Sequence, residues 1–183
     1  MKKILVAVVF LFAASYAPAQ TPATPSSGPA PNPVATSLRI LLPRQQKNTL
    51  AAIEAMPADK FAFKPTAEQV SFAHMVIHIA EFNNNMCSKI ADAAAPKGDE
   101  LKETDSKDKL LAAARTSFDF CTSTLANLDD SKMGDNMDFF GRFQAPRAMA
   151  ALILASGWAD HYGSLAMYLR QNSILPPTAQ PKK

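Results

Sequence analysis

Apolar residues recur at helical spacing along most of this chain, and this periodicity restricts the fold more than any other sequence feature. The spacing is clearest after Ser106, where steps of three and four connect Leu111, Ala114, Phe118, Cys121, Leu125 and Leu128. Such steps place one apolar stripe along an amphipathic helix. No stretch shows strand-like alternation of useful length. The chain is therefore predicted to be all-α.

Three further segments keep the same periodicity, and each has recognisable ends. Ser37 and Ser71 precede the first two segments as capping residues, and Pro146 suits the first turn of the last. Pro43 lies inside the first segment, where it is expected to kink or shorten the helix. The predicted helices cover residues 37–56, 71–95, 104–128 and 146–173. Four helices with short or medium connections predict an up-and-down four-helix bundle.

The amino-terminal segment is typical of a secretory signal peptide. Lys2 and Lys3 precede an apolar run over residues 4–14, and Ala17-Pro18-Ala19 follows as a small-x-small cleavage pattern. The run is well short of the ~20 residues that a membrane-spanning helix needs. We therefore expect cleavage after Ala19, which would leave a periplasmic or secreted protein without a stable membrane span.

The rest of the chain predicts one domain between less ordered flanks. Residues 20–36 are rich in Pro, Ala, Ser and Thr and predict a disordered linker, and residues 179–183 predict a disordered tail. The 48% hydrophobic content supports one core over residues 37–178. Cleavage would leave 17 Lys and Arg against 16 Asp and Glu. Because no remaining stretch concentrates basic and aromatic residues, nucleic acid is not a predicted partner.

The two cysteines, Cys87 and Cys121, leave two alternatives open. An oxidising exported compartment favours a disulfide between them. If the second and third helices form an antiparallel hairpin, however, the two residues are offset along the bundle by about 15 Å at 1.5 Å per residue. A disulfide needs Cα atoms within about 7 Å. The other interpretation is two buried thiols, which suits Cys121 on its apolar stripe.

All three histidines fall on predicted helices. His74 and His78 are four residues apart on the second helix, so their imidazoles project from one face. His161 lies within the apolar stripe of the fourth helix. Three imidazoles that converge inside a bundle would form a metal site. A single histidine on an apolar face is more often a hydrogen-bonded core residue, and that alternative applies to each of them.

Three motifs in order resemble the DinB-like superfamily of helical bundles. They are AMPADKFAFKPT, SFAHMVIHIAEFNNNMC and DHYGSLAMYLRQNSILPP, with FDFC on the third helix between the last two. The resemblance covers residues 38–177. It implies an up-and-down bundle that often holds a divalent metal through three histidines. Some members are thiol-dependent transferases, and many have no established activity.

The resemblance also implies which residues would hold the metal. His78 matches the ligand on the second helix, and His161 matches the later of two ligands spaced by four on the fourth. The earlier position of that pair is Gly157, which has no donor atom. Glycine also weakens a helix interior by ~1 kcal/mol relative to alanine, so it indicates a tolerated loss or room for something to approach. His74 is a candidate replacement that would restore three ligands.

Three other polar residues are secondary candidates. Asp160 either orients an imidazole by a hydrogen bond or makes surface contacts only. Glu81 and Asn85, one and two turns beyond His78, are candidate oxygen ligands. Histidine ligands do not distinguish Zn from Ni or Fe.

Two functional hypotheses follow. The first is an exported metal-dependent transferase or hydrolytic enzyme with His78, His161 and His74 as ligands. The second is a metal-free DinB-like domain that serves as a binding or interaction module, which Gly157 favours. A small-molecule substrate and a homodimer are compatible with both hypotheses, and no catalytic nucleophile with its base is recognisable.

Overall fold

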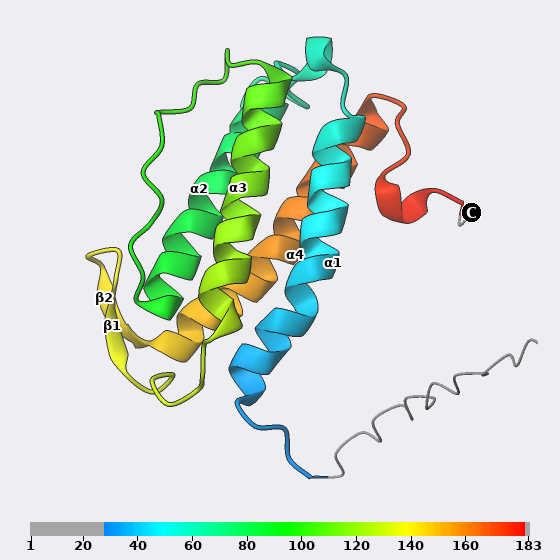
Figure 1. The fold of residues 1–183 in the computed structure, drawn as a ribbon. Coiled ribbons are helices and arrows are strands. Elements are labelled where there is room, and N and C mark those ends of the chain that lie inside the picture. Colours follow the sequence, from blue (N-terminus) through cyan, green and yellow to red (C-terminus); the bar gives the residue numbers. More distant parts are fainter. Residues whose placement is uncertain (1–27, 182–183) are drawn as a thin grey trace, which may run out of the picture.

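Four long helices form a bundle, and a small β-hairpin covers one end of it (Figure 1). The structure is a computed structural model and describes residues 28–181. The predicted signal peptide with its cleavage site, residues 20–27 of the predicted linker and the last two residues of the predicted tail lie outside this range. The elements are α1 (Pro33–Ala55), η1 (Ala58–Lys60), α2 (Phe72–Ala91), α3 (Lys107–Ala126), β1 (Asn136–Phe139), β2 (Phe143–Pro146), α4 (Arg147–Gln171) and η2 (Pro177–Ala179).

Of the two predicted caps, Ser71 is confirmed and Ser37 is not. The Ser71 side chain accepts a hydrogen bond from the backbone of His74, and Ser106 does the same for Lys109. In contrast, α1 begins at Pro33, and the Ser37 hydroxyl donates to the Pro33 carbonyl within the helix. The predicted cap at Ser37 is therefore wrong, because proline is well suited to the first helical turn.

The direction of the third helix differs from the predicted up-and-down bundle. In Figure 1, α1 and α4 run in one direction while α2 and α3 both run in the other. Residues 92–106 form the crossover and travel back along the bundle. Fifteen residues reach about 50 Å when extended, whereas a 20-residue helix is only about 30 Å long. The crossover is thus long enough for a parallel pair, and the predicted antiparallel hairpin is wrong.

This parallel arrangement explains the disulfide between Cys87 and Cys121. Both cysteines lie near the carboxyl ends of their helices, so they are level in a parallel pair. Their Cα atoms are 5.3 Å apart, and both residues are completely buried. The predicted axial offset therefore does not exist, and the disulfide fixes α2 to α3.

The core contains a polar network at the centre of the bundle. Asn83 of α2 is fully buried, donates to the Ser117 hydroxyl of α3 at 3.1 Å and accepts from the Trp158 indole of α4 at 2.9 Å. These two bonds connect three helices. Because buried polar groups are costly when unpaired, the network also sets the relative rotation of those helices.

The phenylalanine-rich segment before α4 forms the hairpin. β1 and β2 pair antiparallel, with Phe139 opposite Phe143. Phe139 is buried, so the segment covers part of the core as its composition indicates. The sequence did not predict its two strands, because four residues are too few to show alternation. Within residues 28–181, no helix is both long enough and apolar enough to cross a membrane.

Candidate functional site

His74 lies in the first turn of α2 and interacts with the crossover. Its side chain is 48% exposed, and Nδ1 is 3.0 Å from a carboxylate oxygen of Glu103. The Ser71 hydroxyl donates to the other oxygen at 2.6 Å. The hydrogen bond from Ser71 and, to a smaller extent, that of His74 hold the pKa of Glu103 below its usual value. His74 therefore anchors the crossover to the start of α2.

His78 and His161 do come together. Their ring centroids are 4.9 Å apart, and their planes are nearly perpendicular at 84°. His78 is exposed on α2, whereas His161 on α4 is only 6% exposed. The structure thus brings together the two histidines that match the family pattern, one facing solvent and one facing the core.

His161 is in an environment that disfavours its protonated form. Burial and, secondarily, the nearby His78 lower its pKa to about 4, although the charge of Asp160 acts in the opposite direction. Its Nδ1 atom is buried and has no hydrogen-bond partner among the described residues. Asp160 is exposed and makes no hydrogen bond to either imidazole in this part of the chain. At neutral pH, His161 is an uncharged imidazole with one unsatisfied nitrogen.

Phe82 occupies the space beside Gly157. A Cβ atom added at Gly157 would lie 2.7 Å from Cε1 and 3.3 Å from Cε2 of the Phe82 ring, and still closer to Cζ. The same ring stands edge-on to His161, with centroids 4.7 Å apart. Glycine at 157 therefore allows the aromatic ring to approach. The ring fills the region where the resemblance expects a third imidazole.

These observations together test the three-histidine site. His74 is engaged with Glu103, and Gly157 is covered by Phe82. Among residues 28–181, no three His, Cys, Asp or Glu side chains are grouped so that they could hold a metal ion. The residues present do not fit the three-histidine site that the family resemblance implies.

A cavity of about 230 Å³ opens next to the histidine pair. Three of its lining residues are polar and four are apolar: His78, Glu81, Asn85, Phe82, Met86, Phe140 and Ile153. Glu81 also borders a larger cavity of about 450 Å³ beneath the crossover. Sequence reasoning missed Phe82 and Phe140 as site residues. For Phe82 there was a signal, because it follows His78 by four residues and so shares its helix face.

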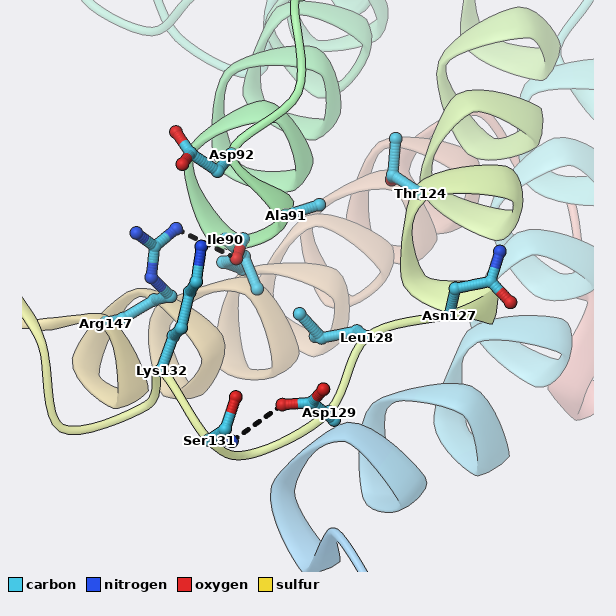
Figure 2. Close-up of a pocket in the computed structure, with 10 residues that line it drawn as sticks. All are labelled: Ile90, Ala91, Asp92, Thr124, Asn127, Leu128, Asp129, Ser131, Lys132 and Arg147. Carbon is cyan, nitrogen blue, oxygen red and sulfur yellow. Dashed lines mark hydrogen bonds between the residues drawn. The ribbon is translucent and has the colours of Figure 1, made fainter.

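A separate cavity of about 240 Å³ lies at the carboxyl ends of α2 and α3 (Figure 2). Lys132 and Arg147 extend there toward the last turn of α2. The Arg147 guanidinium donates to the carbonyls of Lys89 and Ile90, at 2.6 and 3.1 Å. Cations at a helix carboxyl end satisfy free carbonyls and complement the helix dipole. The Arg147 guanidinium therefore caps the end of α2, and none of the three histidines lines this cavity.

The family is established by comparison with known proteins. The family model of the DinB superfamily matches residues 41–164, which is most of the chain. This chain belongs to the DinB superfamily. A comparison with curated proteins found no match.

Solved structures of other DinB-like proteins share the fold. A DinB-like protein from Bacillus subtilis, YjoA, is 19% identical with a TM-score of 0.63, and the match covers 79% of this chain and 99% of that one. A DinB-like protein from Bacillus cereus is 14% identical with a TM-score of 0.63, and the match covers 78% and 95%. At these identities the likeness concerns the fold alone.

Proposed function

We propose that this DinB-superfamily protein is an exported binding domain that takes up a small molecule in the cavity beside His78. In this proposal the domain does not use the three-histidine metal centre that the family resemblance implies. The observation that carries the proposal is the Phe82 ring over Gly157, which fills the third ligand position with a group that cannot coordinate a metal. An apolar cavity with a few convergent polar groups is the usual form of a small-molecule site.

The disulfide supports export. Disulfides persist in the periplasm and outside the cell, whereas cytosolic thiols are kept reduced. A buried bond between Cys87 and Cys121 fits a protein that matures in an oxidising compartment. The predicted signal peptide over residues 1–19 leads to the same proposal from independent residues.

A metal-dependent enzyme is the second candidate function, and one distance favours it. Two imidazoles that share an ion through metal–nitrogen bonds of about 2.0–2.1 Å bring their ring centres to roughly 5 Å. The centroids of His78 and His161 are 4.9 Å apart. Glu81 borders the adjacent cavity and would be a candidate oxygen donor in this alternative. Such a site would hold Zn, Ni or Fe with two histidines and not three.

Metal analysis of untagged mature protein distinguishes the two functions. The protein is incubated with Zn, Ni or Fe salts, passed through a desalting column, and its metal content is measured beside that of His78→Ala and His161→Ala. We expect far less than one equivalent in all three. One equivalent in the parent that both variants lose would refute the proposal and support the enzyme.

A rebuilt site provides the positive control. The double variant Phe82→Ala/Gly157→His removes the ring and places an imidazole one turn before His161, where both would face the same side. We expect this variant to retain close to one equivalent of Zn under the same conditions. If it binds no more than the parent, the Phe82 ring is not what separates this chain from a metal site, and the argument from Gly157 fails.

A further inference from the structure

Phe140 occupies a backbone conformation that bulky residues rarely adopt. Its φ is 57°, that of the following Gly141 is 69°, and the Arg142 amide donates to the Phe139 carbonyl at 3.2 Å. Two central residues with positive φ and this hydrogen bond define a type I′ turn, in which asparagine or glycine is preferred at the first position. A phenylalanine there is strained, and such strain is concentrated at functional sites.

The strained turn places an aromatic ring at the cavity beside His78. Phe140 lines that cavity from the hairpin, while the other lining residues come from α2 and α4. Its side chain is half exposed, so burial in the core does not account for it. The ammonium of Lys89 lies 5.0 Å from the Phe140 ring centroid, which shows that a cation can approach this ring.

The lining of the cavity combines several rings with one charge. Phe82, Phe140 and the His78 imidazole supply the rings, and Glu81 is the only Asp, Glu, Lys or Arg among the lining residues. Aromatic faces attract cations through their quadrupoles, and quaternary ammonium groups are commonly recognised by rings of this kind. The Glu81 carboxylate, which also lines the cavity, favours a positively charged ligand as well.

We propose that this cavity binds a small organic cation of the alkylated ammonium class, with Phe140 and Glu81 as its specificity-determining residues. The inference rests on the proposed binding function and specifies its ligand. The volume of about 230 Å³ is below the roughly 300–1,000 Å³ of drug-sized sites, so it suits a compact head group. Lys89 opposes the ligand, because its charge competes for the Phe140 ring.

Choline and its uncharged carbon isostere, 3,3-dimethylbutan-1-ol, test the charge requirement at constant shape. Both are titrated into chelator-treated mature protein and followed by calorimetry and by NMR shifts of the His78 and Phe140 rings. We expect choline to bind at least about tenfold more tightly than the isostere. Equal affinity for both would overturn the cation class while leaving a binding function intact. No binding of choline would also overturn it.

Variants then test the named residues. Glu81→Gln should weaken choline binding about two- to fivefold, and Glu100→Gln on the exposed crossover should leave it unchanged. Phe140→Asn should weaken binding about three- to thirtyfold. Because asparagine suits the turn, the melting temperature of the Phe140→Asn variant should be equal to or above that of the parent. Lys89→Met should strengthen binding.

The outcomes separate this inference from the proposed function. If Phe140→Asn binds choline like the parent, the ring does not contact the ligand and the inference is wrong. A lower melting temperature in the same variant would then show that the ring serves packing. Weaker binding by Lys89→Met would contradict the competing role of that lysine and with it the position of the cation. Failure of the metal-free function is detected independently, by the metal content of the untreated protein.

Discussion

Replacing Gly157 with alanine tests whether the Phe82 ring really fills the third ligand position. The new methyl group would lie 2.7 Å from Cε1 of Phe82, well inside the ordinary carbon–carbon contact of about 3.5–4.0 Å. Overpacking of this kind typically costs about 1–3 kcal/mol. Alanine in a helix interior recovers about 0.5–1 kcal/mol relative to glycine. We therefore expect Gly157→Ala to lower the free energy of unfolding by about 0.5–2 kcal/mol.

The same substitution should have the opposite sign once the ring is removed. In a Phe82→Ala background nothing opposes the methyl group, so Gly157→Ala should raise the free energy of unfolding by about 0.5–1 kcal/mol. The two effects imply a coupling energy between positions 82 and 157 of about 1–3 kcal/mol. Gly163→Ala in the same helix is the matched control, because a Cβ added at Gly163 has no neighbour within 4 Å.

Urea denaturation followed by far-UV circular dichroism measures all four free energies of the cycle. The parent, the two single variants and the double variant are unfolded under one buffer condition at neutral pH. A coupling energy below about 0.5 kcal/mol is within the usual additivity of independent sites and would refute the reasoning. It would mean that the half-buried Phe82 ring moves aside at little cost, so that position 157 remains accessible to a ligand.

Three further predictions concern the core, the disulfide and pH. Asn83→Ala should lower the free energy of unfolding by about 2–4 kcal/mol, because it leaves the buried Trp158 indole N–H unpaired and removes the hydrogen bond to Ser117, whose hydroxyl still donates to the Ala114 carbonyl. Asn85→Ala at the cavity should change it little in urea denaturation. Replacing both Cys87 and Cys121 with alanine should cost about 3–4 kcal/mol for a loop of 34 residues, and a loss below about 1 kcal/mol would contradict this. The lowered pKa of His161 means that the unfolded state binds more protons between pH 6.5 and about 4. Stability should therefore fall by up to about 3 kcal/mol as pH drops through this window, and urea midpoints of a His161→Phe variant should lack that dependence.

The predicted helices matched the structure where local signals are strong. Ser71 caps α2 as predicted, because capping depends on residues within one turn. Pro33 shows the limit of the same approach. It lies in a stretch whose composition predicts disorder, yet it begins α1, and the Asp130 carboxylate accepts hydrogen bonds from the next two backbone amides, at 2.8 and 2.9 Å. Asp130 is distant in the sequence, so no local pattern reveals it.

The candidate site, too, was predictable only in part. His78 and His161 were identified by motif and lie together in the bundle. His74 was a reasonable third ligand because it shares a helix face with His78. Its imidazole is instead bound to Glu103, a residue of the crossover whose path the sequence pattern does not specify. Phe140 was missed because its role depends on a turn conformation that its residue type disfavours.

The sequence by itself determined the four helices, the cap of the second helix at Ser71 and the glycine at position 157, because these features depend on spacing and on residues within a turn. Only the tertiary structure decided that α2 and α3 are parallel, which makes Cys87 level with Cys121. It also decided that the Phe82 ring fills the space beside Gly157. The physical reason is that chain direction and side-chain approach between helices are set by long-range packing. A one-dimensional pattern records which face of a helix is apolar, but not which side chain will meet it.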